Sequence, residues 1–125
     1  MSLTLVGTIL IVEDSPSELE LMSHYLQEGG YNVIKASGAK EAIEKALVQK
    51  PDVIVTDVVM PGMSGFELCR SLKRNPITAK VPIVICSSKN QAIDRLWAMK
   101  QGASDYITKP YTREHLLRAI KSVVI

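Results

Sequence analysis

The sequence predicts an α/β fold with a doubly wound, five-stranded parallel sheet. Short apolar, β-branched segments alternate five times with segments of helical periodicity, and the connections between them are short. The strand segments are almost continuously apolar, which is typical of a parallel sheet covered by helices on both faces. Strands are expected at residues 8–12, 32–36, 52–56, 81–86 and 105–108, and helices at 16–28, 39–49, 65–74, 90–101 and 112–124.

The first helix carries the clearest start and stop signals. Ser15 is suited to the N-cap position, Pro16 to the first helical position, and Glu18 to the reciprocal end of a capping box. Gly29 and Gly30 follow the last apolar residue of the pattern and are expected to end the helix.

Length and composition indicate one cytoplasmic domain. The chain has 125 residues, 46% of them hydrophobic and 22% charged, which suits a single domain with one core. No apolar run approaches the ~20 residues of a transmembrane helix. The opening segment lacks the basic region of a signal peptide. Cys69 and Cys86 fall in helical and strand patterns and are interpreted as buried apolar residues. We expect one domain over residues 1–125, without membrane insertion and without an attached effector domain.

The charge is unevenly distributed along the chain. Residues 1–68 carry ten acidic and four basic side chains, whereas residues 69–125 carry eleven basic and three acidic ones. A nucleic-acid surface is one interpretation of the basic half. The basic residues are scattered singly along helices, however, and few aromatic side chains are available to stack on bases. A solvated helical surface, with no direct nucleic-acid contact, is therefore the expectation.

Polar residues follow four of the five predicted strands. Because the carboxyl ends of parallel strands meet at one edge of the sheet, these residues are expected to converge. Three converging carboxylates repel one another unless a cation is shared between them, and Mg²⁺ prefers such oxygen ligands. A carboxylate can attack phosphorus to give an aspartyl phosphate, while a metal and a lysine offset the charge of the phosphoryl group. The converging residues are Glu13 and Asp14, Asp57, Ser87, and Lys109.

These residues, with Met60, Pro61 and Gly65 after Asp57 and Pro110 after Lys109, resemble the receiver domain of two-component response regulators. The resemblance covers residues 8–124. It implies a flavodoxin-like fold with strand order 2-1-3-4-5. It also implies that Asp57 accepts a phosphoryl group from a histidine kinase, and that the protein is not an enzyme beyond its own phosphorylation and dephosphorylation.

The resemblance further implies roles for the other site residues. Asp14, Asp57 and the backbone carbonyl of Val59 would bind Mg²⁺. Glu13 stands where the family more often has aspartate, and its longer side chain leaves direct or water-mediated metal contact open. Ser87 would move to bind the phosphoryl group, Lys109 would pair with it, and Tyr106 would turn inward as an aromatic switch. The Lys109–Pro110 peptide bond is expected to be cis.

The output surface is expected on the fourth helix, fifth strand and fifth helix. Residues 94–103 resemble the stand-alone regulators of pilus-based twitching or phototaxis systems, which suggests motility or chemotaxis signalling. Trp97 in this segment suits either core packing or a partner contact.

Three alternatives use a similar fold or site. A phosphate sink or phosphorelay intermediate needs the same residues as an output protein. A flavin-binding electron carrier needs a hydroxyl- and glycine-rich phosphate loop, whereas Glu13 and Asp14 would repel a phosphate in the absence of a cation. An aspartyl phosphatase usually has a second aspartate two residues after the nucleophile, where this chain has Val59.

Overall fold

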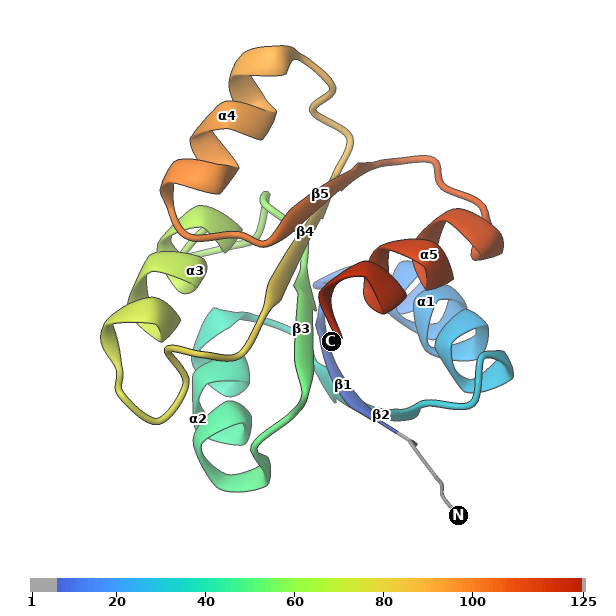
Figure 1. Ribbon diagram of the computed structural model, residues 1–125, viewed down its shortest axis with the longest axis horizontal. Coiled ribbons are helices and arrows are strands. Elements are labelled where there is room, and N and C mark those ends of the chain that lie inside the picture. Colours follow the sequence, from blue (N-terminus) through green and yellow to red (C-terminus); the bar gives the residue numbers. More distant parts are fainter. Residues whose placement is uncertain (1–6, 125) are drawn as a thin grey trace.

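The computed structural model of the protein describes residues 7–124, in which five strands alternate with five helices (Figure 1). The strands are β1 (Thr8–Val12), β2 (Asn32–Ala36), β3 (Val53–Thr56), β4 (Ile83–Ser87) and β5 (Asp105–Thr108). The helices are α1 (Pro16–Glu28), α2 (Ala39–Gln49), α3 (Gly65–Arg74), α4 (Ala92–Lys100) and α5 (Arg113–Val123). Within the described residues, no helix has the length and apolar character needed to span a bilayer.

The sheet has the predicted topology. All paired strands are parallel, and their order is β2-β1-β3-β4-β5. Val12 at the end of β1 is level with Thr56 at the end of β3, and Ser87 at the end of β4 is level with Thr108 at the end of β5. The polar residues that follow these strands therefore meet at one edge of the sheet.

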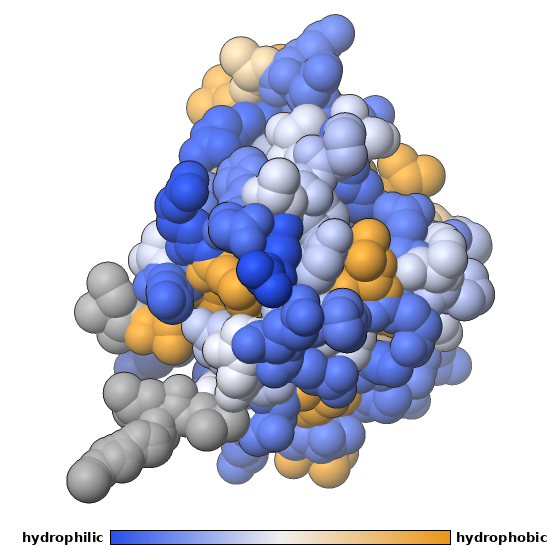
Figure 2. Space-filling model, turned by 90° about the vertical axis from the view of Figure 1, so that its right-hand side faces the viewer, coloured by the Kyte–Doolittle hydropathy of each residue, from blue (hydrophilic) through white to orange (hydrophobic). Residues whose placement is uncertain are grey.

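Helices cover both faces of the sheet: α1 and α5 lie on one side, and α2, α3 and α4 on the other (Figure 1). Because successive strand residues point to opposite faces, β1 contributes to two cores. Ile9 and Ile11 pack in the core beneath α1 and α5, whereas Leu10 and Val12 pack in the core on the other face. Figure 2 views the molecule from the α1 and α5 side, where the surface is largely hydrophilic with isolated hydrophobic side chains.

Strands β3 and β4 and helices α4 and α5 differ from the predicted bounds by one or two residues, β3 by starting at Val53, α4 by also ending at Lys100 and α5 by also ending at Val123. Strand β4 begins at Ile83 rather than residue 81, because Val81 donates to Thr78 in a turn, and it extends to Ser87. Helix α4 begins at Ala92 rather than residue 90, since Gln91 is its N-cap. Helix α5 begins at Arg113 because Thr112 is its N-cap, accepting a hydrogen bond from the amide of His115.

The N-terminus of α1 is partly as predicted. Ser15 is the N-cap and Pro16 opens the helix, but the capping box is wrong, because the Ser15 side chain makes no capping hydrogen bond. The Ser15 amide donates to Glu13 Oε2 at 3.1 Å, and the Glu18 side chain instead contacts Lys109.

The two cysteines are free and buried, as predicted. Burial raises the pKa of the Cys69 thiol to about 11 and that of Cys86 to about 12. Both side chains therefore act as small apolar groups in the core.

Candidate functional site

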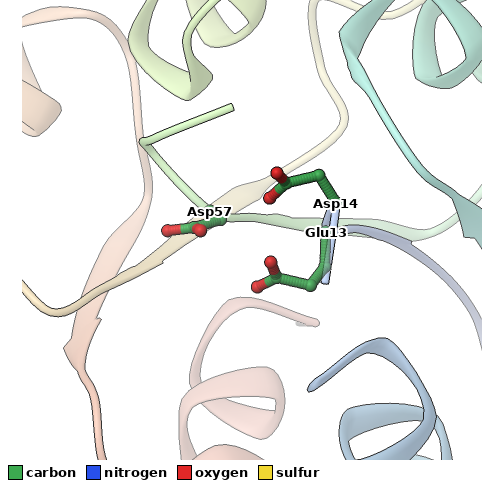
Figure 3. A group of neighbouring side chains, drawn as sticks. All are labelled: Glu13, Asp14 and Asp57. Atoms are coloured by element: carbon green, nitrogen blue, oxygen red, sulfur yellow. The ribbon is translucent and has the colours of Figure 1, made fainter. Parts of the chain in front are cut away.

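Three carboxylates gather where β1 and β3 end (Figure 3). Glu13 and Asp14 directly follow β1, and Asp57 directly follows β3. One carboxylate oxygen from each residue lies within 4.8 Å of the others. Glu13 is only 2% exposed, whereas Asp14 is exposed to solvent. The parallel register of β1 and β3 thus brings together the acidic residues that the sequence predicted would converge.

Lys109 supplies the cation of the group. Its Nζ lies 2.8 Å from Glu13 Oε1, 2.7 Å from Glu18 Oε1 and 3.4 Å from Asp57 Oδ2. The backbone amide of Lys109 donates to the carbonyl of Ser87 at 2.8 Å, which fixes the residue at the end of β5. The Lys109–Pro110 bond is cis, as the sequence led us to expect.

Burial and pairing shift the ionisation of Glu13 and Lys109. Burial raises the pKa of the Glu13 carboxyl, and its hydrogen bonds with Lys109 and the Ser15 amide oppose that rise only in part. Burial alone would lower the pKa of Lys109, but hydrogen bonds with Glu13 and Glu18 raise it above the usual value. Lys109 therefore remains an ammonium ion throughout the neutral range.

The Asp57 side chain is oriented by backbone groups. The Val58 amide donates to Asp57 Oδ1 at 2.7 Å, and the Asp57 amide donates to the Val12 carbonyl at 3.1 Å. With Oδ1 held in this way, Oδ2 is the oxygen nearer Lys109. Asp57 thus has one oxygen fixed by the chain and one facing the cation.

Gly65 allows the backbone to pass close to Asp57. A β-carbon at this position would lie 2.0 Å from the Asp57 carbonyl oxygen, well inside van der Waals contact. Only glycine fits such an approach without a shift of the backbone. The start of helix α3 at Gly65 therefore packs directly against the backbone of Asp57, the candidate phosphate acceptor.

Ser87 and Tyr106 are both buried and both bind the loop after β4. The Ser87 hydroxyl accepts a hydrogen bond from the Lys89 amide at 3.2 Å, and the Tyr106 hydroxyl donates to the Lys89 carbonyl at 2.6 Å. Tyr106 therefore lies in the inward position here, and burial raises the pKa of its phenol. Tyr106 already occupies the inward position without a phosphoryl group, so the predicted inward turn is not needed to reach it. A coupling between Tyr106 and a movement of Ser87 stays a prediction.

The donor set fits a magnesium ion. Carboxylate oxygens within 4.8 Å of one another are hard ligands, and a cation would relieve their mutual repulsion. Glu13, Asp14 and Asp57 would hold the ion, with the Val59 carbonyl as a further predicted ligand. When bound, Mg²⁺ supplies positive charge beside a phosphoryl oxygen. The valine side chain has no donor atom, so only the backbone carbonyl of Val59 is suited to this role.

Replacing Asp14 by asparagine tests this fit. Without metal, we expect Asp14→Asn to raise the free energy of unfolding by up to ~1 kcal/mol, because it removes one repelling charge near the surface. Wild-type stability should rise with Mg²⁺ concentration, and that response should be much weaker in the variant. Urea unfolding in EDTA and in millimolar Mg²⁺ measures both effects. Equal metal responses in the two proteins would contradict the assignment of Asp14.

Comparison with known proteins identifies the family. The profile of the response regulator receiver domain matches residues 9–121, so the chain belongs to this family. The protein is therefore the receiver domain of a two-component response regulator, as the sequence motifs indicated.

One similar relative is comparable in length. Protein PilH of Pseudomonas aeruginosa is 40% identical over 119 residues, which cover 95% of this chain and 98% of PilH. The chain spans about half the length of the transcriptional regulators that it also matches.

Solved structures support the same assignment. The chemotaxis protein CheY4 of Vibrio cholerae superposes with a TM-score of 0.90 at 32% identity, covering 95% of this chain and 99% of CheY4. The receiver domain of sensor histidine kinase PA1611 from Pseudomonas aeruginosa superposes with a TM-score of 0.88 at 27% identity, covering 96% and 98%. A magnesium ion is coordinated in the active-site cleft of that PA1611 domain.

Proposed function

We propose that the protein is a response regulator that is phosphorylated on Asp57 by a histidine kinase in a Mg²⁺-dependent reaction. The observation that carries this proposal is the position of Asp57 between two acidic residues and the Lys109 ammonium. We expect the reaction to take place in the cytoplasm.

The transfer needs few groups beyond these. A carboxylate oxygen of Asp57 attacks phosphorus, the bond from phosphorus to the donor imidazole nitrogen breaks, and that nitrogen keeps the electron pair. Catalysis of phosphoryl transfer is mostly positioning and charge stabilisation. The Val58 amide fixes the attacking carboxylate, and Lys109, which stays protonated, offsets charge on the phosphoryl oxygens.

Ser87 and Tyr106 are proposed to transmit the change. In the new state the Ser87 hydroxyl would bind a phosphoryl oxygen instead of the Lys89 amide. Because the Tyr106 hydroxyl holds the carbonyl of that same Lys89, movement of one residue alters the environment of the other. Two states that differ by a few kcal/mol suffice for such a switch.

The output surface is proposed to be α4, β5 and α5. Helix α4 has four large exposed apolar side chains, Ile93 (62%), Leu96 (52%), Trp97 (48%) and Met99 (41%), while Ala98 faces the core. The exposure of Trp97 favours the partner contact over core packing. Similarity to PilH and to the chemotaxis protein CheY4 supports a motility or chemotaxis pathway. We expect the output partner to be a protein that binds this exposed apolar surface.

Phosphorylation by acetyl phosphate tests the proposal. In Mg²⁺ we expect one phosphoryl group per chain by intact-protein mass spectrometry, and none in Asp57→Asn. Excess EDTA should also prevent the reaction. Incorporation that persists in Asp57→Asn, or in EDTA, would overturn the proposal.

We also expect a long-lived phosphoryl group. Val59 and Lys89 lie two residues after Asp57 and Ser87, and neither can orient and deprotonate an attacking water. Since orientation contributes several kcal/mol to such reactions, Val59→Asn with Lys89→Glu should shorten the lifetime about tenfold, equivalent to ~1.4 kcal/mol. The lifetime is measured as the decrease in the phosphorylated fraction of the protein, by intact-protein mass spectrometry, after the phosphoryl donor is removed. An unchanged or longer lifetime would show that water placement does not set the rate.

A further inference from the structure

Lys109 has an acidic partner that the phosphorylation chemistry does not require. An ammonium has three N–H donors. Two of the carboxylates around Lys109, those of Glu13 at 2.8 Å and Glu18 at 2.7 Å, are within hydrogen-bonding distance. Asp57 lies farther away, at 3.4 Å. In this state Lys109 is therefore bound more closely by Glu13 and Glu18 than by the candidate phosphate acceptor.

We propose that Glu18 is a positioning residue that retains Lys109 in the unphosphorylated state and competes with the incoming phosphoryl group for its ammonium. The inference rests on the proposed phosphorylation of Asp57 and assigns to that site a restraint that lies on α1. Within residues 7–124, Glu18 makes no hydrogen bond or ion pair with Asp57 or the candidate metal ligands, so it acts through Lys109.

The two partners of Lys109 differ in how readily they can be exchanged. Glu13 is buried, and removing its cation would leave an unpaired charge in the protein interior. The Glu18 side chain is 49% exposed and can exchange its ion pair for water at little cost. Lys109 can therefore release Glu18 and turn toward the phosphoryl oxygens while it keeps its hydrogen bond with Glu13.

The position of Glu18 in α1 supports a tertiary role. It is the third residue of the helix, where its carboxylate could have completed a capping box with Ser15, yet no such hydrogen bond forms. The side chain instead contacts a residue 91 positions later in the chain. In α3 the same arrangement, Ser64 with Glu67, does form the local capping box.

The effect is measurable with acetyl phosphate as the donor. A carboxylate oxygen of Asp57 attacks phosphorus, the bond from phosphorus to the acyl oxygen breaks, and acetate leaves with the electron pair. We expect Glu18→Gln to increase the rate of this transfer about two- to fivefold, the range for an exposed ion pair. Glu20→Gln is the matched control, since Glu20 is on the same helix but pairs with Lys35. Its rate should equal that of the wild type.

Repeating the Glu18→Gln substitution in a Lys109→Met variant distinguishes an effect of Glu18 through Lys109 from direct repulsion between Glu18 and the phosphoryl donor. In Lys109→Met, adding Glu18→Gln should give no acceleration, because the competition has no ammonium left to act on. The same gain in both backgrounds would mean that Glu18 acts through space, and the inference would be overturned. An unchanged or slower rate for Glu18→Gln in the wild-type background would also overturn it.

Unfolding supplies a readout that is independent of phosphorylation. A double-mutant cycle of Glu18→Gln and Lys109→Met in urea should give a coupling of about two- to fivefold in the unfolding equilibrium constant. No coupling would refute the contact itself. If the wild type fails to be phosphorylated while the coupling is present, the proposed function fails and the contact stands. If phosphorylation proceeds and the coupling is absent, the proposed function stands and the inference about Glu18 fails.

Discussion

Gly65→Ala is expected to lower the free energy of unfolding by about 2–3 kcal/mol, the upper part of the ~1–3 kcal/mol that extra volume in a packed site usually costs. The added β-carbon would lie 2.0 Å from the Asp57 carbonyl oxygen and 3.0 Å from the α-carbon of Val58. Both are backbone atoms, which cannot rotate away as the end of a flexible side chain can. The loop after β3, or the start of α3, must therefore move.

The same displacement should impair phosphorylation strongly. The Val58 amide fixes one oxygen of Asp57, so a shift of this peptide misplaces the nucleophile. A misplacement of about 1 Å can cost on the order of a hundredfold in rate. Urea unfolding and acetyl phosphate kinetics measure the two effects.

Gly38→Ala is the control for this substitution. Gly38 has an extended φ of −168°, and a β-carbon added there would have no neighbouring atom within 4 Å, although the residue is the N-cap of α2. Its replacement should cost less than ~1 kcal/mol and leave phosphorylation unchanged. If Gly65→Ala behaved like Gly38→Ala, the close approach to Asp57 would not constrain the site.

Lys109→Met should give the second large effect. It removes the cation from three neighbouring acidic residues, of which Glu13 is buried. Breaking a buried ion pair from one side costs ~3–5 kcal/mol. We expect about 2–3 kcal/mol in EDTA, because Lys109 is partly exposed and Glu13 can take up a proton. Phosphorylation should become very slow.

The stability loss should depend on pH. Without Lys109, the pKa of Glu13, already raised by burial, would rise further above its unfolded value. A carboxyl with a raised folded pKa is protonated in the folded state, so stability falls as pH increases above the unfolded pKa. The deficit should therefore be smaller near pH 5 than at pH 8. Lys40→Met, at an exposed lysine on α2, should show no such dependence. A deficit of equal size at both pH values would contradict this account of Glu13.

Much of the fold could be predicted from the periodicity of apolar residues and from the glycine, proline and capping residues at the ends of helices and strands. The bounds of α2 are as predicted, since its apolar spacing is regular and Pro51 follows. Strand order was not derivable from these patterns and came from the family resemblance. The start of β4 was displaced by two residues, because apolar Val81 is held in a turn by Thr78, a contact that composition does not reveal.

The site was predictable where it depends on strand ends. A parallel sheet brings Glu13, Asp57 and Lys109 together whatever their side-chain conformations. The contact between Glu18 and Lys109 was not predictable from the sequence. The same Ser-x-x-Glu pattern forms a capping box at Ser64 but makes no capping hydrogen bond at Ser15. The local sequence does not show whether the glutamate side chain caps its own helix or binds a lysine 91 residues later in the chain. The close approach of Gly65 to Asp57 was likewise not predictable, since the sequence marked Gly65 only as the start of a helix and as part of the motif after Asp57.

The most direct test of the account is to locate the phosphoryl group in the chain. An aspartyl phosphate is an acyl phosphate, which borohydride reduces to the alcohol, so the modified aspartate becomes homoserine. After reaction with acetyl phosphate and Mg²⁺, followed by reduction and peptide mass mapping, homoserine should be found at position 57 alone. Homoserine at position 14, reduction of the Glu13 side chain to an alcohol, or a phosphoryl group found only on a histidine would contradict the assignment of Asp57 as the acceptor.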